Sequence, residues 1–489
     1  MAITAGDNLN SVALPQRQTL STNYIDFTNA NTQGWAQQYL PDLMEKEAEV
    51  FGNRTISGFL SQVGAEEAMA SDQVIWSEQG RLHLSYNGTV VTAQNYITIG
   101  TDIDGNAAGT EHGIRAGDTI LVSSATTTVR CYVQTIDPDT DNRAEILVLP
   151  YTGAATLGAH FGSNDTVTVL VYGSEHAKGT TGRTGANTPQ FQTFTNKPMI
   201  LKDKYEISGS DASAIGWVEV SGEDGQNGYM WYLKAEGDTR ARFTDYLEMS
   251  MLEAVNGGAN NTIDTTFAAG GFSGIAATGA GAAVGSEGLF AAIESRGNMT
   301  SGVTGVNWAT DLAEFDAILA EFDRQGSIEE NMMFVNRTTS LAIDDMLAGI
   351  NGGYAGGASY GVFDNEEDMA LNLGFSGFRR GSYDFYKSDF KYLNDRGTRG
   401  GMLDTVNAIR GVIIPAGVTS VYDQSLGKNL KRPFLHVRYR SSKTDDRKMK
   451  TWVTGSVGAT TSDLDAMEIH YLSERCLIVQ GANNFMLMN

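Results

Sequence analysis

The chain has 489 residues and a formal net charge of -23, from 35 Lys and Arg against 58 Asp and Glu. This length predicts about two to four domains, and the acidic charge argues against a general nucleic-acid binder, which carries a basic footprint. The 56 glycines and 8 prolines depart from average usage. Collagen is excluded because no Gly-X-Y period occurs, and 41% hydrophobic residues argue against disorder.

The charge is unevenly distributed along the chain. Residues 376–450 contain 16 Lys and Arg against 7 Asp and Glu, so the rest of the chain is more acidic than the total suggests. One interpretation is that basic and acidic regions meet when the chain folds or when copies of it assemble. The other is a phosphate-binding face, and the sequence leaves both open.

The N-terminal segments indicate an extended arm and show no export signal. Residues 1–18 have neither a basic n-region nor an apolar h-region. Residues 1–35 are polar and show no sustained period, so we expect an extended arm. A short helix is predicted after Trp35, with Pro41 in its first turn. The uncharged stretch Thr265–Ser286 is dominated by Gly and Ala, which predicts a loop rather than a membrane span.

A β-rich region follows the arm. Residues 73–86 alternate in strand fashion, and five short apolar runs with Asp, Asn and Gly turns occupy residues 87–179. Such spacing predicts a small barrel or sandwich. Strand patterning resumes over residues 189–208, so we interpret the module as an insertion into a long two-stranded hairpin.

Helices dominate the next part of the chain. The longest is predicted over Tyr229–Val255, where Phe243, Leu247 and Met251 recur every four residues. A second helix is predicted over Asp311–Gln325, with Asp311 and Glu314 as its capping box. The short strand Met332–Val335 and a third helix capped by Asn336 complete a mixed α/β region.

The end of the chain returns to strands. The alternating pattern predicts strands at Phe434–Arg440, Met449–Val457, Met467–Leu472, Arg475–Gln480 and Phe485–Met488, with a hydrophilic turn at Ser441–Arg447.

Candidate catalytic and metal motifs are weak. Ser359 lies in a G-x-S-x-G string, but inside a Gly-rich loop rather than between a strand and a helix. Asp137, Asp139 and Asp141 begin like a calcium loop whose required Gly and final acid are missing. The acidic turn Asp102–Asn106 is a second weak cation candidate. The six histidines never pair at metal-ligand spacing, and Cys131 and Cys476 lie in apolar strands with no partner nearby. We therefore predict no enzyme, no catalytic residues, no metal and no cofactor.

The order of elements resembles the major capsid proteins of tailed bacteriophages, which have the Hong Kong 97-type fold. The most specific local match is Glu474-Arg475 followed by the apolar run Cys476–Val479 and by Phe485. The resemblance implies an α+β capsid fold with an inserted β-module. Its parts are the N-terminal arm (1–72), the E-loop (73–208) carrying the module (about 87–179), a peripheral domain (209–258) with spine helix 229–255, an axial domain (259–430) and returning peripheral strands (431–489).

The resemblance also implies function and partners. The protein is expected to self-assemble through hexameric and pentameric capsomers into an icosahedral shell around packaged double-stranded DNA, without sequence-specific binding. The other expected partners are scaffolding and portal proteins, together with decoration or minor capsid proteins. No membrane association is expected. Assembly in the host cytoplasm and residence in the virion follow. The inserted module departs from the minimal fold. No long helical, charged scaffolding region precedes the arm, so we expect either a separate scaffolding protein or a leader that has been removed.

Two alternatives stay open. An extracellular surface-layer or adhesin protein fits the acidity and the β-module but predicts an export signal. A serine hydrolase would use Ser359 as its nucleophile.

Overall fold

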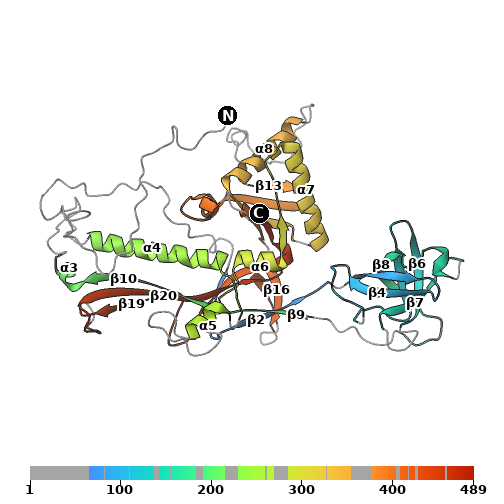
Figure 1. Ribbon diagram of the computed structural model, residues 1–489, viewed down its shortest axis with the longest axis horizontal. Helices are drawn as coiled ribbons and strands as arrows, with labels where there is room; N and C mark the ends of the chain where they lie inside the picture. The colour runs from blue at the N-terminus through green and yellow to red at the C-terminus, as the bar shows by residue number, and fades with distance from the viewer. Residues whose placement is uncertain are drawn as a thin grey trace. The chain divides into compact units, whose positions relative to one another are not determined.

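The computed structural model describes residues 65–489 except 82, 110, 137–142, 154–155, 183–190, 215–229, 259–260, 269–284, 327, 354–376, 403–407, 417, 424–427 and 458–459 (Figure 1). The fold is α+β, as predicted. It divides into two compact units, residues 76–194 and the described residues on either side of them. Residues 1–64 of the predicted arm (1–72), the helix after Trp35, Ser359 and Asp137–Asp141 lie outside the described residues.

The smaller unit is a closed six-stranded barrel in the order β3-β4-β7-β6-β5-β8. Buried and outward residues alternate along β6, because successive side chains point to opposite faces. Val90, Ile97, Ile120, Val148 and Val169 are fully buried in its core. The prediction of a barrel or sandwich resolves as a barrel. Its strands are β3 (Ser85–Val91), β4 (Tyr96–Asp102), β5 (Asp118–Ser123), β6 (Thr128–Ile136), β7 (Glu145–Pro150) and β8 (Thr166–Ser174), with the 3₁₀ turn η1 (Leu157–Ala159).

Strands β2 (Val74–Gln79) and β9 (Phe191–Asn196) flank the barrel in sequence and pair with each other as a two-stranded ribbon. The Trp76 and Phe194 rings lie 6.0 Å apart on this ribbon. The barrel is therefore inserted between two paired strands.

The larger unit contains a five-stranded sheet under a long helix. Its strands are β1 (Ala65–Met69), β10 (Met199–Ser208), β18 (Leu435–Arg440), β19 (Lys450–Gly455) and β20 (Ala466–Val479). Helix α4 (Met230–Glu253) runs along β10 and β20 (Figure 1). Phe243 and Leu247 pack with Tyr205, Ile207 and Tyr471, so the four-residue spacing read from the sequence marks the buried stripe.

Strand β20 is one continuous strand, although the sequence predicted two. The polar residues Ser473 and Glu474 lie between the two predicted strands, and Arg475 is the predicted start of the second. All three are buried, and the ladder to β10 continues through Arg475. Their side chains have partners inside the fold, so the strand does not need to end where its sequence becomes polar.

A second sheet has six strands in the order β11-β21-β15-β12-β14-β13. Helices α7 (Trp308–Gln325) and α8 (Arg337–Gly353) pack on it around Phe315, Phe322, Ile343 and Phe385. Strand β21, predicted with the returning strands of 431–489, pairs here with β11 and β15 instead. The strands are β11 (Asn298–Thr300), β12 (Glu330–Val335), β13 (Gly377–Arg380), β14 (Tyr383–Asp389), β15 (Gly411–Pro415) and β21 (Met486–Met488).

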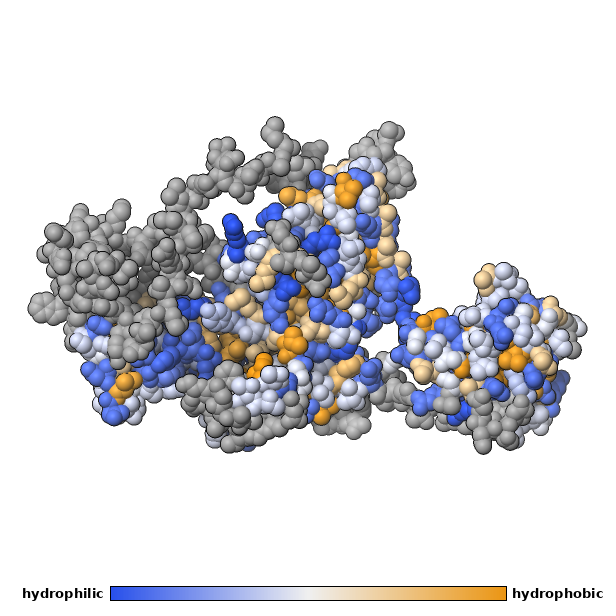
Figure 2. Space-filling view, in the orientation of Figure 1, coloured by the Kyte–Doolittle hydropathy of each residue, from blue (hydrophilic) through white to orange (hydrophobic). Residues whose placement is uncertain are grey.

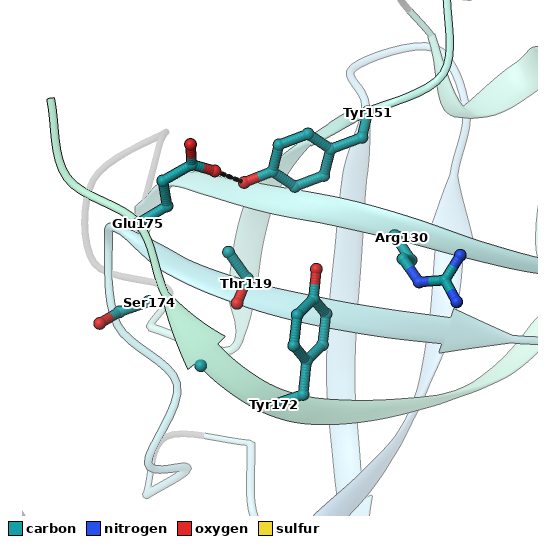
Figure 3. A pocket seen from close by; sticks show the side chains of 7 residues that line it. Thr119, Arg130, Tyr151, Tyr172, Ser174 and Glu175 are labelled. Atoms are coloured by element: carbon teal, nitrogen blue, oxygen red, sulfur yellow. Dashed lines mark hydrogen bonds between the residues drawn. The ribbon is translucent and has the colours of Figure 1, made fainter.

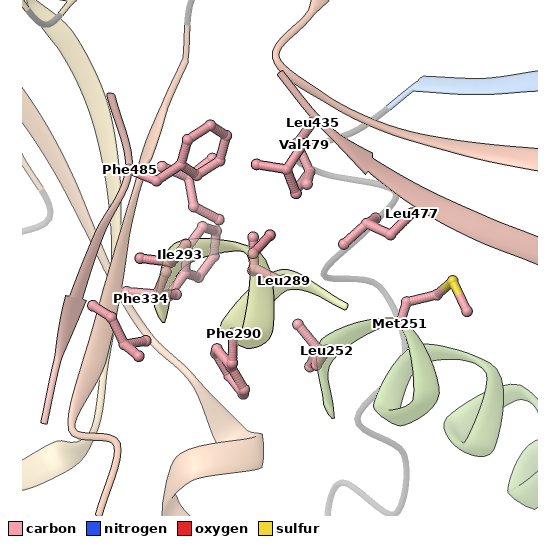
Figure 4. Packing of buried hydrophobic residues seen from close by; sticks show 14 of the residues in the cluster. Met251, Leu252, Leu289, Phe290, Ile293, Phe334, Leu435, Leu477, Val479 and Phe485 are labelled. Carbon is pink, nitrogen blue, oxygen red and sulfur yellow. The ribbon is translucent and has the colours of Figure 1, made fainter. Parts of the chain in front are cut away.

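Helix α6 (Leu289–Arg296) joins the two sheets. Its Leu289, Phe290 and Ile293 point into one apolar cluster with Phe334 and Phe485 (Figure 4). Leu435 and Leu477 from the five-stranded sheet and Met251 and Leu252 from α4 complete the cluster. Each large apolar side chain buried here contributes about 2 kcal/mol of transfer free energy. This cluster is therefore the main link between the two sheets.

The helix caps were only partly predicted. Helix α7 (Trp308–Gln325) begins earlier than expected, because the Asn307 side chain accepts hydrogen bonds from the Ala309 and Thr310 amides. The predicted capping box of Asp311 and Glu314 is therefore wrong. The Asn336 cap of α8 (Arg337–Gly353) is confirmed, since its Oδ1 accepts from the Thr339 amide at 2.8 Å.

The remaining elements are short. They are α3 (Gly209–Ala214), α5 (Thr262–Ala268), α9 (Lys391–Asn394), η3 (Arg399–Met402), η4 (Ala482–Asn484) and the paired strands β16 (Val418–Asp423) and β17 (Lys428–Pro433).

Candidate assembly surfaces

The basic segment 376–450 finds acidic partners inside the chain. Lys387 Nζ lies 2.5 Å from Asp344 Oδ1, and both side chains are almost fully buried. Arg399 reaches Glu253 at the end of α4. The same pattern joins the segment to acidic residues outside it in the pairs Arg380–Asp316, Arg438–Glu67, Arg447–Glu474 and Lys448–Glu66. Two further pairs lie within the segment, Arg379–Asp384 and Lys391–Asp395. For these residues the first interpretation holds: basic and acidic regions meet when the chain folds.

Strand β1 enters the five-stranded sheet through such pairs. It runs parallel to β18, with Ala65 opposite His436 and Met69 opposite Arg440. Arg438 Nη2 lies 2.7 Å from Glu67 Oε2. The carboxylate of Glu66 contacts Lys448 on the other side. Charged pairs thus reinforce the backbone ladder where the chain leaves the N-terminal segment.

The motif Glu474-Arg475 forms the inner part of this charged region. Glu474 accepts a hydrogen bond from Arg440 at 3.2 Å and forms an ion pair with Arg447 at 2.9 Å, with only 5% of its side chain exposed. Arg475 donates to Ser473 Oγ at 2.8 Å and to the Lys448 carbonyl at 2.9 Å. Burial lowers the pKa of Arg475, and the nearby Glu66 and Glu248 partly oppose that shift. The motif acts as a structural junction between β18, β20 and the turn that follows β18.

The face of the sheet opposite α4 is polar. Lys204 Nζ binds Glu206 at 2.7 Å and Glu468 at 3.1 Å. The Trp452 ring stacks on His470 at 5.1 Å. Burial opposes ionisation of Glu468, but hydrogen bonds from Lys204 and Thr454 outweigh it and lower the pKa of that carboxyl. This face can therefore remain in water or meet another polar surface.

The exposed apolar side chains of the larger unit include Ile75 and a group near the start of α7. Ile75 on the β2 ribbon strand is 63% exposed. Val306 and Trp308 before and at the start of α7 are 70% and 43% exposed. Leu341 on α8 is also exposed. Because Gly305 packs against Ala342, the segment with Val306 and Trp308 lies at the same end of the α7–α8 pair as Leu341. Figure 2 shows such hydrophobic patches scattered over an otherwise hydrophilic surface.

The sequence-predicted chemical candidates do not come together. Both carboxylate oxygens of Asp102 accept from Asn106, so the first acidic turn closes on itself. Within the described ranges no three His, Cys, Asp or Glu side chains gather as metal ligands. No described helix is long and apolar enough to cross a membrane.

Both thiols are buried. Cys131 lies in the barrel core and Cys476 in β20, each with no exposed area. Burial raises the pKa of each thiol to about 12. Neither is poised as a nucleophile, which agrees with the prediction of inert cysteines.

Comparisons with known proteins give structural likenesses only. No family model matches the chain, and no curated protein does. A structure of Gordonia phage Cozz shares 10% identity over 96% of this chain and 98% of that chain, with a TM-score of 0.40. The capsid structure of cyanophage P-SCSP1u shares 8% identity over 92% of each chain, with a TM-score of 0.38. The capsid of the native GTA particle shares 10% identity over 94% of this chain and 97% of that chain, with a TM-score of 0.36. The chain is thus similar, over nearly its whole length, to solved phage and GTA-particle structures.

Proposed function

We propose that this protein is the major capsid protein of a tailed bacteriophage. Copies of the chain assemble into hexameric and pentameric capsomers of an icosahedral shell that encloses double-stranded DNA. The chain acts as a structural component of the virion and carries out no catalysis. Scaffolding, portal and decoration or minor capsid proteins are its further partners, and assembly takes place in the host cytoplasm.

The domain layout follows the predicted boundaries. Residues 1–72 form the arm, 73–208 the E-loop with its barrel, 209–258 and 431–489 the peripheral domain, and 259–430 the axial domain. Helix α4 on the five-stranded sheet supports the peripheral assignment, and α7 and α8 on the six-stranded sheet support the axial one. Three strands cross these boundaries: β1 and β10 join the peripheral sheet, and β21 joins the axial sheet.

One observation carries the proposal: the chain forms two ribbons that pair only with themselves among the described strands. These are β2 with β9 and β16 with β17. An isolated two-stranded ribbon is at best marginally stable in water, because it buries too little apolar surface. Ile75 on β2 presents 63% of its surface to solvent. Neighbouring copies would supply the missing cover, which is what a shell protein requires.

The test is electron microscopy of the full chain, purified with and without coexpressed phage scaffolding protein. Closed shells, or rings of six and five copies, are expected. Ile75→Asp should block assembly and leave the fold intact, because the side chain projects into solvent. Ile103→Asp is the matched control, since Ile103 is 45% exposed on the barrel turn. A chain that stays monomeric by sedimentation in both preparations would contradict the proposal.

A further inference from the structure

A shallow pocket of about 540 Å³ lies on the outer face of the barrel. It is lined by Thr119, Arg130, Tyr151, Tyr172, Gly173, Ser174 and Glu175 (Figure 3). These residues come from β5, β6 and β8 and from the segments that follow β7 and β8. The pocket belongs to one rigid, closed barrel, so its lining residues are held by a common core.

Two tyrosines occupy the middle of the pocket. Tyr151 and Tyr172 are 51% and 53% exposed, so a ligand can reach both rings from solvent. Figure 3 shows both rings between Glu175 at one end and Arg130 at the other. A tyrosine presents an apolar ring and a hydroxyl that can donate and accept, so it suits ligands that are apolar on one side and polar at the edges.

The two ends of the pocket have opposite charges. The Tyr151 hydroxyl donates to Glu175 Oε2, which fixes the position of that carboxylate. Its Oε1 has no hydrogen-bond partner among the described residues and can accept from a ligand. Arg130 makes neither an ion pair nor a side-chain hydrogen bond to any residue in the described part of the chain. A free guanidinium is a ready bidentate partner for a carboxylate.

The floor of the pocket is kept open by a glycine. Gly173 lies opposite Thr119 in the β5–β8 ladder, next to an irregularity in the register. A Cβ at position 173 would lie 3.2 Å from Thr119 Oγ1. Without that side chain, Thr119 remains beside the space between the tyrosines, as Figure 3 shows.

We infer that this pocket binds an acidic saccharide, a sugar that carries a carboxylate. The apolar C–H face of the sugar ring stacks on Tyr172, its carboxylate pairs with Arg130, and its hydroxyls donate to Glu175 and Thr119. A saccharide fits better than a peptide, because the pocket is small and shallow and most of its lining side chains carry a hydroxyl or a charge. Few well-placed polar groups around an apolar platform are typical of small-ligand sites.

The test is calorimetric titration of the full-length protein with trigalacturonic acid, 3′-sialyllactose and lactose. The first two carry a carboxylate from different sugar classes, and their comparison separates plant- or capsule-type uronic acids from sialic acids. Lactose is the neutral reference. We expect at least one acidic sugar to bind about tenfold more tightly than lactose, the gain typical of a charge-assisted contact.

Variants locate the site. Arg130→Gln should weaken the acidic sugar about tenfold and leave lactose unchanged. Tyr172→Ala should abolish binding of all three, with the thermal midpoint of the protein showing that the barrel remains folded. Arg143→Gln, an exposed barrel arginine outside the pocket, is the matched control and should bind like the parent chain. Three results would overturn the inference: equal binding of lactose and acidic sugars, unchanged binding in Arg130→Gln, or no saccharide binding at all. The last result would indicate that the tyrosines contact a protein instead.

Discussion

The Asn196 side chain donates a 2.6 Å hydrogen bond to the main-chain carbonyl of Leu477, a residue 281 positions away in sequence. Asn196 also donates to the Glu287 carbonyl at 3.0 Å and accepts from the Glu287 amide at 2.9 Å. Only 1% of its surface is exposed. One side chain therefore joins the end of β9, the C-terminal end of the long strand β20 and the segment before α6.

Asn196→Ala should destabilise the larger unit by about 2 kcal/mol, because buried backbone groups of Glu287 and Leu477 lose their partner. Urea unfolding monitored by circular dichroism measures this change. Gln192→Ala, at an exposed position of the same strand, is the control and should have little effect. Equal stability of both variants would show that water replaces the lost hydrogen bonds.

Glu474→Ala should cost about 2–3 kcal/mol, because it leaves Arg440 and Arg447 without their shared buried carboxylate. Glu321→Ala removes a carboxylate that pairs with Arg324 on the exposed face of α7. That control should change the free energy of unfolding by less than about 0.5 kcal/mol. If the two variants unfold at the same urea concentration, the buried junction contributes no more than a surface pair.

The barrel should lose stability as the pH falls below about 6.5, the usual pKa of an unfolded histidine. Burial lowers the pKa of His112, whose Nε2 lies 2.6 Å from the Arg143 carbonyl. Below pH 6.5 the His112 imidazole binds a proton in the unfolded chain but stays neutral in the folded barrel. The free energy of unfolding is therefore highest above that pH and decreases as the pH falls below it.

Hydrogen exchange of barrel peptides between pH 8 and pH 5 checks this prediction, after correction for the intrinsic pH dependence of exchange. His112→Gln keeps a donor for the carbonyl and cannot become charged. It should therefore remove the pH-dependent part of the loss. A variant that retains the full pH slope would assign the effect to another group.

Cys131 and Cys476 should resist maleimide at pH 8 in the native protein. With pKa values of about 12, about one thiol in ten thousand is ionised at that pH. Both side chains also have no exposed area. Mass spectrometry should find no label before unfolding and two labels in concentrated urea. Rapid native labelling of either residue would show that its strand opens readily.

Removal of the barrel should leave the larger unit folded. Replacing residues 81–189 by a short Gly-Ser linker closes the β2–β9 ribbon directly, and each unit has its own apolar cluster. We expect the amides of β20 to keep their protection in hydrogen exchange. Loss of that protection would mean that the barrel contributes to the folding of the larger unit.

Patterns in neighbouring residues predicted much of the local structure. Alternation marked the barrel strands, and the spacing of Phe243, Leu247 and Met251 marked the buried stripe of α4. The Asn336 cap was predictable because its partner, the Thr339 amide, lies three residues away. The choice between Asn307 and Asp311 as the cap of α7 was not, since both residues suit the role and Asp311 instead accepts from the Gly305 amide.

Only the tertiary structure decided which distant segments pair. The chemistry of Glu474-Arg475 looks like a strand end, and these residues continue β20 because Arg440, Arg447 and Lys448 arrive from another part of the chain. Strand β21 joins the six-stranded sheet through β11 and β15, and the pocket of Tyr151, Tyr172, Arg130 and Glu175 forms when the barrel closes. The sequence by itself determined where strands and helices occur, because periodicity and caps are short-range. Sheet order, buried charge pairs and the pocket depend on contacts between residues far apart in the chain, and only folding brings those together.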